Sequence, residues 1–241
     1  MNILLTGASR GLGLEICKRL LSDGASVYAV ARTRTEELEA LEASFPGALF
    51  FRKADLSAPE NAAAEIFSDA FISNRTSLSG FVSNAAQAYD DLVTNISAAR
   101  LRAMYEVNVF APMLLTKFAI RNMIFNRAPG SIVHISSVSA HTGYKGLAMY
   151  ASCKGAIEAF SKNTAREWGP RGIRSNTVVP GFMETSMNGG LSQGQKDRIY
   201  ARTSLKKATE ISSVAETAAF LLSDKAASVT GQNIHVDAGT V

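Results

Sequence analysis

The sequence predicts an α/β fold in which one parallel sheet of seven strands is doubly wound, with helices on both faces. Two observations lead to this prediction. Short apolar segments alternate with longer amphipathic segments along the whole chain, which is the order of elements in an α/β protein. Several of the short segments are apolar at successive positions, as strands buried on both faces of a parallel sheet are.

The seven strands are expected at residues 2–6, 26–31, 48–53, 79–83, 131–136, 174–179 and 233–236. Helices are expected between them, at residues 11–22, 34–44, 59–72, 98–126, 149–168 and 212–222. A helix that connects two parallel strands of one sheet forms a right-handed crossover, and a series of such crossovers produces a doubly wound sheet.

Residues 181–203 interrupt this alternation. The segment begins at Gly181 and mixes further glycines with apolar side chains: Gly189, Gly190, Gly194, Phe182, Met183, Met187, Leu191 and Ile199. A long segment of this kind inside a compact domain is usually functional or mobile. We expect a lid that closes over an apolar ligand, and the alternative is a poorly ordered surface loop.

The composition is that of a globular protein, and 241 residues fit one domain spanning 1–241. The net charge of +4 is modest and forms no concentrated basic face, so we do not expect nucleic acid as a partner. No apolar run approaches ~20 residues, so no membrane span is expected. The three histidines are scattered, so no metal site is predicted.

Two features predict a cytoplasmic protein. Cys17 and Cys153 form no CxxC motif and fall in expected helices, which is typical of reduced thiols. The first strand is expected to begin at Asn2, which leaves no room for a signal peptide.

A glycine-rich turn follows the first strand and opens the first helix. Gly7 permits the tight turn, and Gly11 and Gly13 allow the backbone to approach a pyrophosphate and the helix to pack on the strand. The free N–H groups at the helix start, together with the helix dipole, then face the phosphates. The expected cofactor contacts of this turn are Gly7, Ser9, Arg10, Gly11, Leu12 and Gly13.

The end of the second strand indicates which dinucleotide binds. An NAD site usually places an acid there to bind the ribose 2′-hydroxyl. This chain has Arg32 instead, with Arg10 expected nearby, and no acid before Glu36. Guanidinium groups attract a 2′-phosphate, so NADP(H) is preferred and NAD(H) is the alternative. The arginines are solvent-facing loop charges if this interpretation is wrong.

Tyr150 and Lys154 are four residues apart on an expected helix and therefore lie on one face of it. An ammonium group beside a phenol stabilises the phenolate and is expected to lower its pKa from about 10. The pair thus predicts a general acid that works near neutral pH.

Taken in order, the motifs resemble the short-chain dehydrogenase/reductase family over nearly the whole chain. The matching motifs are Thr6-Gly-x-x-x-Gly-x-Gly13, Asp55-Leu56, Asn84-Ala85-Ala86, Asn108, Ser137, Tyr150-x-x-x-Lys154, and Pro180-Gly181 followed by Thr185. Residues 180–185 and 230–237 are similar to the β-ketoacyl-carrier-protein reductase branch and its alcohol-dehydrogenase relatives. The resemblance implies one Rossmann-type, NAD(P)-binding domain.

The resemblance also implies roles for four catalytic residues. Tyr150 would protonate the carbonyl oxygen of the substrate as hydride arrives from the nicotinamide. Lys154 would support Tyr150 and bind the nicotinamide ribose. Ser137, with Ser136 and Ser139 as less favoured alternatives, would stabilise charge on the substrate oxygen. Asn108 would hold a water that links Lys154 to solvent.

Further cofactor contacts follow from the same resemblance. Asp55 and Leu56 would meet the adenine, although Asp55 also has the sequence position to cap the next helix. Asn84 and Ala85 would border the cofactor where the central strands end. Pro180, Gly181 and Thr185 would reach the carboxamide or the phosphates. Two departures, Ala86 and Ala238 where the family usually has glycine, remove no catalytic group.

The expected function is an NADPH-dependent carbonyl reductase that converts a ketone into a secondary alcohol. A 3-oxoacyl thioester is the first substrate hypothesis, carried by acyl carrier protein or CoA, with Arg127 and Arg171 as candidate docking residues. One alternative is a dehydrogenase of a sugar, steroid or other secondary alcohol. Another, of a different class, is a non-catalytic nucleotide-binding scaffold. The resemblance implies a homotetramer or homodimer.

Overall fold

The computed structural model describes residues 1–185 and 192–241 and contains one sheet of seven strands in the order β3-β2-β1-β4-β5-β6-β7. All six neighbouring pairs are parallel. The strands are β1 (Asn2–Thr6), β2 (Ser26–Ala31), β3 (Leu49–Lys53), β4 (Gly80–Ser83), β5 (Gly130–Ile135), β6 (Ile173–Pro180) and β7 (Asn233–Val236). The predicted fold class and all seven predicted strands are confirmed.

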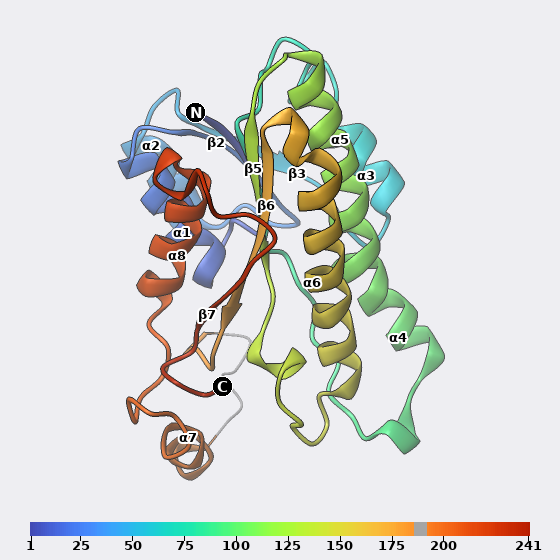
Figure 1. Ribbon diagram of the computed structural model, residues 1–241, viewed down its shortest axis with the longest axis vertical. Helices are drawn as coiled ribbons and strands as arrows, with labels where there is room; N and C mark the ends of the chain where they lie inside the picture. The colour runs from blue at the N-terminus through green and yellow to red at the C-terminus, as the bar shows by residue number, and fades with distance from the viewer. Residues whose placement is uncertain (186–191) are drawn as a thin grey trace.

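Helices cover both faces of the sheet (Figure 1). One apolar core joins the sheet to α1 (Gly11–Ser22), α2 (Glu36–Ser44) and α8 (Ile211–Leu222). A second core joins the opposite face to α3 (Pro59–Ile66) and α5 (Ala111–Phe125). On this second side, α4 (Ala98–Tyr105) and α6 (Ala148–Trp168) share a smaller apolar cluster. Shorter helical turns lie at Val93–Asn95, Val138–Ala140, Gly169–Arg171 and Asp224–Ala226.

The segment 98–126, predicted as one helix, is divided by a stretch of π-helix at Glu106–Phe110. Pro112 has no backbone N–H, so it cannot donate the usual helical hydrogen bond to the carbonyl of Asn108. The N–H of Ala111 donates instead to the carbonyl of Glu106, five residues earlier. Asn108 therefore lies in a π-helical turn, a feature often found at functional sites.

Two other predicted boundaries are corrected. The helix expected at 59–72 ends at Ile66, where the Ser68 hydroxyl donates to the carbonyl of Glu65 and occupies one of the last helical acceptors. Within the predicted lid, Gln193–Tyr200 forms a helix, α7. It begins with a capping box in which Ser192 and Gln195 satisfy each other's backbone N–H groups.

The strand order reverses between β1 and β4, and ligands of open α/β sheets bind at such a point, beyond the carboxyl ends of the strands. The glycine-rich turn after β1 and the segments after β4, β5 and β6 all leave the sheet at this edge. In the described residues, no helix is long and apolar enough to cross a membrane.

Candidate active site

The turn after β1 has room only for glycine at two positions. Gly7 has a φ of +71°, and a Cβ built on it would lie 2.8 Å from the Cα of Ala85. A Cβ on Gly13 would lie far inside contact distance of the carbonyl oxygen of Gly7. The backbone, not a flexible side chain, blocks both positions. Glycine is therefore required for α1 to start so close to β1 and β4.

Asn84 braces this turn against the end of β4. Its side-chain amide donates to the carbonyl oxygens of Thr6 and Gly7, both at 3.1 Å. The Thr6 hydroxyl in turn accepts from the backbone N–H groups of Asn84 at 3.1 Å and Ala85 at 3.3 Å. Because the carbonyl of Gly7 is held in this way, the turn has a fixed shape at the strand crossover.

The start of α1 has the features of an anion site. Arg10 occupies the N-cap position without a side-chain hydrogen bond to the helix, and the first turn contains no acid. Gly11 has a φ of +54°, and a Cβ placed there would lie 3.9 Å from the side chain of Thr185. Thr185 therefore lies beside the start of α1. The residues present fit a dinucleotide pyrophosphate.

The loop after β2 is tied to the glycine-rich turn, because the Thr35 hydroxyl donates to the carbonyl of Ser9 at 2.7 Å. Arg32 and Arg10 are exposed, and neither forms an ion pair with a described residue. Arg34, by contrast, pairs with Glu39 and Glu42 on α2. The predicted pair Arg10 and Arg32 is therefore available to a phosphate.

Asp55 and Leu56 differ in what they offer an adenine. Asp55 is exposed and accepts from the backbone N–H of Ser57 at 3.0 Å, a contact that holds the pKa of its carboxyl below the usual value. Asp55 thus stabilises the turn before α3 but does not cap that helix, whose N-cap is Ala58. Leu56 and Leu12 are 6% and 7% exposed and belong to the apolar cores, so only their backbones are free to meet a ligand.

Pro180 is the last residue of β6, and Gly181 and Thr185 follow it. Gly181 donates its N–H to the carbonyl of Val236 at 3.0 Å, and a Cβ on it would lie 2.7 Å from the Cα of Asp237. This close packing fixes the path of the chain toward Thr185. Met187, Gly189, Gly190 and Leu191 of the predicted lid lie outside the described residues.

Tyr150 and Lys154 lie one helical turn apart at the start of α6. The Lys154 ammonium is buried, donates to the carbonyl oxygen of Ile135 at 2.8 Å, and lies 5.4 Å from the centre of the Tyr150 ring. Ile135 is the last residue of β5, and Ser137 follows it by two. The hydrogen bond therefore joins the helix that bears Tyr150 to the strand that leads to Ser137.

The expected lowering of the Tyr150 pKa is wrong for this structure. Burial raises the pKa of the phenol well above its usual 10.0, and the thiol of Cys153 and the carboxylate of Asp90 act in the same direction. Lys154 points its ammonium at Ile135 rather than at the phenol oxygen, and burial lowers its own pKa from 10.5 to about 8. Tyr150 is thus fully protonated at neutral pH, the form that a general acid needs.

Among the three candidate serines, the structure separates Ser137 from its neighbours. The hydroxyl of Ser136 is buried and donates to Glu158, and that of Ser139 is buried without a hydrogen-bond partner in the structure. Ser137 is half-buried, and its Oγ accepts from the N–H of Ser139 at 3.2 Å. This bond leaves the Ser137 hydroxyl proton available to a substrate oxygen.

Asn108 holds the loop that follows β4. Its Oδ1 accepts from the backbone N–H of Gln87 and its Nδ2 donates to the Gln87 carbonyl, both at 2.8 Å. The side chain is 2% exposed. The π-helical turn, the loop after β4 and α6 thereby meet beside the predicted catalytic residues.

Comparison with known proteins decides the family. A family model described as enoyl-(acyl carrier protein) reductase matches residues 7–241. Carbonyl reductase (NADPH) 2 of Sus scrofa is 32% identical over 99% of this chain and 96% of its own length. 3-Oxoacyl-(acyl-carrier-protein) reductase FabG of Escherichia coli (strain K12) is 33% identical over 98% of this chain and 95% of its own length.

The chain belongs to the short-chain dehydrogenase/reductase family. A solved structure of a candidate 2-deoxy-D-gluconate 3-dehydrogenase from Agrobacterium tumefaciens, with bound NADP, superposes with a TM-score of 0.91 at 27% identity. The superposition covers 99% of this chain and 95% of the chain in the solved structure. As a member of this family, the protein is an NAD(P)-dependent oxidoreductase.

In this short-chain dehydrogenase/reductase, a cavity of about 390 Å³ lies at the start of α6. Its lining comes from the loop after β4 and the loop before α6: Asp91, Leu92, Val93, Thr94, Tyr144, Lys145, Gly146 and Ala148. The two loops are joined by the N–H of Asp91, which donates to the carbonyl of Gly146 at 2.9 Å. Tyr150, Ser137 and Lys154 are not among the lining residues of this cavity.

Sequence reasoning missed the carbonyl of Ile135 and the backbone of Gln87 as partners of Lys154 and Asn108. Backbone groups carry no residue-type signal, so no pattern in the sequence identifies them. It also missed Asp90, whose carboxyl has a pKa raised by burial and which raises the pKa of the Tyr150 phenol.

Proposed function

We propose that this protein is an NADPH-dependent carbonyl reductase that converts a ketone into a secondary alcohol. The observation that carries the proposal is the hydrogen bond from Lys154 to Ile135. It holds the helix that bears Tyr150 against the end of the strand that leads to Ser137, so both residues lie at one edge of the sheet. The same edge holds the glycine-rich turn and Thr185. An acid, a hydroxyl donor and a dinucleotide cradle are the parts that carbonyl reduction requires.

The chain's own residues handle the proton in this proposal. A bound nicotinamide supplies the hydride. Tyr150 donates its phenolic proton to the carbonyl oxygen, and burial keeps that proton in place until the oxygen becomes basic. Ser137 donates a hydrogen bond to the same oxygen and stabilises its developing negative charge. Lys154 binds the ribose, and its charge, 5.4 Å from the centre of the Tyr150 ring, stabilises the phenolate that remains. Asn108 holds the loop after β4 at Gln87.

Preference for NADPH is proposed from Arg32 and Arg10. Both are exposed and form no ion pair with a described residue, and the Thr35–Ser9 hydrogen bond joins the loops that carry them. Two guanidinium groups at this position favour a 2′-phosphate over a free hydroxyl. Lower affinity for NADPH than for NADH would refute this part of the proposal.

A 3-oxoacyl thioester is the first substrate to test. The cavity beside α6 includes the apolar side chains of Leu92 and Val93. The likeness to the Escherichia coli reductase adds support for a substrate of this class. Carriage by acyl carrier protein or CoA is part of this proposal.

The candidate docking residues for a carrier lie at the far edge of the sheet. Arg127 precedes β5 and Arg171 precedes β6, which places both at the amino ends of the strands. Both side chains are exposed. Ser137 lies at the carboxyl end of β5, about 20 Å away for a strand of six residues. These arginines therefore cannot contact a substrate bound at the Tyr150 of their own subunit, and a carrier docked there would need a long arm or another subunit's site.

A dehydrogenase of a sugar or other secondary alcohol is the second candidate. The same cavity contains Asp91, Tyr144 and Lys145, whose polar groups suit a substrate with several hydroxyls. The likeness to the candidate gluconate dehydrogenase supports it as well.

The decisive experiment follows NADPH oxidation with acetoacetyl-CoA, an acetoacetyl carrier protein, L-xylulose and cyclic ketones, and the reverse reaction with the matching alcohols. Turnover of the acetoacetyl thioesters with NADPH supports the first proposal. Turnover of sugars alone supports the second. Cofactor binding without turnover of any substrate would instead support a non-catalytic scaffold.

Single-domain organisation over residues 1–241, a cytoplasmic location and assembly as a homotetramer or homodimer also remain proposals. For assembly, α5 and the turn before it expose Phe110 and Phe125, which are 49% and 66% accessible. Phe110, Met113 and Leu114 line a groove of about 510 Å³ on the same helix. Light scattering measures the mass in solution, and a monomeric mass would reject the assembly.

A further inference from the structure

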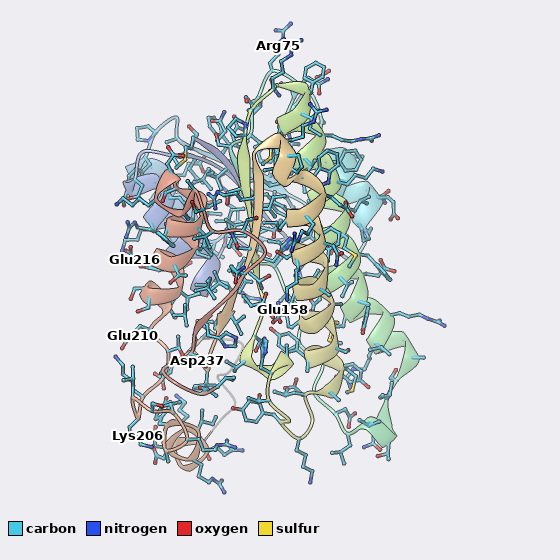
Figure 2. All side chains as sticks on the ribbon, in the orientation of Figure 1. Arg75, Glu158, Lys206, Glu210, Glu216 and Asp237 are labelled. Atoms are coloured by element: carbon cyan, nitrogen blue, oxygen red, sulfur yellow. The ribbon has the colours of Figure 1, made fainter. Side chains whose placement is uncertain are left out.

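One buried carboxylate joins three separate segments next to the candidate catalytic residues. Glu158 lies in α6, on the side that faces the sheet (Figure 2). Its Oε1 accepts from the hydroxyl of Ser136, and its Oε2 accepts from Nδ2 of Asn233 at 2.8 Å. Nε2 of His141 lies 2.9 Å from Oε2 and 3.1 Å from Oε1. The residue as a whole is 8% exposed.

Two of these partners lie on either side of Ser137. Ser136 and His141 flank the short segment after β5 that carries Ser137. Glu158 follows Lys154 by four residues, as Lys154 follows Tyr150, so the three side chains form a stripe along one face of α6. The carboxylate thus holds both ends of the Ser137 segment against α6, the helix that bears Tyr150 and Lys154.

The cost of burying a carboxylate shows that the arrangement is specific. A buried charge without partners is strongly unfavourable, and loss of one partner leaves it uncompensated. Glu158 accepts from the Ser136 hydroxyl and contacts the His141 ring on the Ser137 segment, and it accepts from the Asn233 amide on β7. A displacement of the Ser137 segment along α6 would break the two contacts of Ser136 and His141, so the carboxylate fixes the position of that segment.

The negative charge of Glu158 also acts on Lys154. Burial lowers the pKa of the ammonium to about 8, and Cys153 and then Glu158 oppose this effect. The other titratable groups around the pair are Tyr150 on α6, His134 on β5, Asp90 after β4, and His235 and Asp237 on and after β7. His235 lies with its ring centre 4.6 Å from that of His141, on the solvent side of the network.

We propose that Glu158 is a positioning residue of the carbonyl-reduction site, whose carboxylate aligns Ser137 with Tyr150 and whose charge sustains the ammonium of Lys154. The proposal rests on the proposed reductase function. It assigns a function to a glutamate that touches neither substrate nor cofactor.

Three variants separate charge, geometry and general stability. Glu158→Gln removes the charge but keeps an amide that can bond Ser136, Asn233 and His141 after the Asn233 amide turns over. Glu158→Ala removes both. Ser161→Ala is the matched control, because the Ser161 hydroxyl makes a buried 2.8 Å hydrogen bond to Ser175 that joins α6 to β6 away from the Ser137 segment.

Activity against pH is the first readout, with NADPH and a carbonyl substrate that the wild type reduces. For Glu158→Gln, kcat at pH 6.5 stays within about threefold of the wild type, and the alkaline limb of the profile moves about one pH unit lower. For Glu158→Ala, kcat falls about 10- to 100-fold at every pH with little change in the KM for NADPH. Ser161→Ala loses thermal stability but keeps the profile of the wild type.

A substrate-free readout tests the charge effect independently. In the protein without cofactor, the 13Cε signal of labelled Lys154, assigned by its loss in Lys154→Met, is titrated with pH. The midpoint is expected to be about one pH unit lower in Glu158→Gln than in the wild type and unchanged in Ser161→Ala.

A Lys154 midpoint and a pH profile unchanged in Glu158→Gln, or an equal loss of kcat in Glu158→Ala and Ser161→Ala, overturn the proposal. If the wild type reduces no carbonyl of the panel while the Lys154 midpoint moves, the reductase function fails and the electrostatic link between Glu158 and Lys154 stands. The two failures are therefore distinguishable.

Discussion

The ammonium of Lys154 on α6 donates to the carbonyl oxygen of Ile135 at the end of β5, at 2.8 Å. A buried ammonium needs an acceptor, and the carbonyl at the end of β5 supplies it. The bond sets the distance between α6, which bears Tyr150, and the segment that carries Ser137.

Removal of the phenolic oxygen tests the proposed acid. Tyr150→Phe is expected to lower kcat for carbonyl reduction by about 10²- to 10⁴-fold, because the substrate oxygen loses its proton donor. The affinity for NADPH, measured by fluorescence titration, is expected to remain within a few-fold. Retention of most of the activity would show that another group supplies the proton.

The buried ammonium has a consequence for stability against pH. The pKa of Lys154 is lower in the folded protein, at about 8, than its usual 10.5, so the unfolded chain binds more protons between these values. The wild type should therefore gain stability as pH rises from about 8 toward 10.5, by on the order of 2–3 kcal/mol.

Lys154→Met lacks this gain, and it serves as the reference for urea unfolding at several pH values from 7 to 10. The difference between wild type and variant is expected to move in favour of the wild type as pH rises. A difference that stays constant with pH would contradict the burial effect.

The second glycine of the helix start tests the fit of the turn. Gly13→Ala is expected to cost several kcal/mol of stability and to abolish NADPH binding, because its Cβ would meet the carbonyl oxygen of Gly7. Gly194→Ala in α7 is the control, since no atom of the described residues outside the neighbouring helix backbone lies within 4 Å of a Cβ there. That variant should be neutral or slightly more stable, because alanine favours helices. Thermal unfolding and fluorescence titration measure both effects.

A reversal of charge tests the cofactor preference. Arg32→Asp is expected to weaken NADPH binding about 10- to 100-fold and to leave NADH binding unchanged or stronger, because a carboxylate repels the 2′-phosphate. Arg34→Asp is the matched control in the same loop, and its guanidinium already pairs with acids of α2. Equal effects of the two variants on NADPH affinity would reject a specific role for Arg32.

Short runs of successive apolar residues predicted the parallel sheet, because a strand covered by helices on both faces needs apolar side chains at nearly every position. Residues 131–135 illustrate this, since five successive positions of β5 are buried. The same reasoning could not divide residues 98–126, because an apolar stripe continues through a π-helical turn. Pro112 was the available signal for that break, and Ser192 with Gln195 was the signal for α7.

By itself the sequence determined the fold class, the glycine-rich turn and the family, because these depend on local patterns and on residue types at fixed spacing. It also placed Tyr150 and Lys154 on one helical face, whereas Glu158, one turn further along, was not singled out. Tertiary structure alone decided the charge states and the partners. The sign of the Tyr150 pKa shift follows from burial, and the contacts of Glu158 come from segments up to 75 residues away. Desolvation and long-range hydrogen bonds exist only after the chain has folded, so no local pattern encodes them.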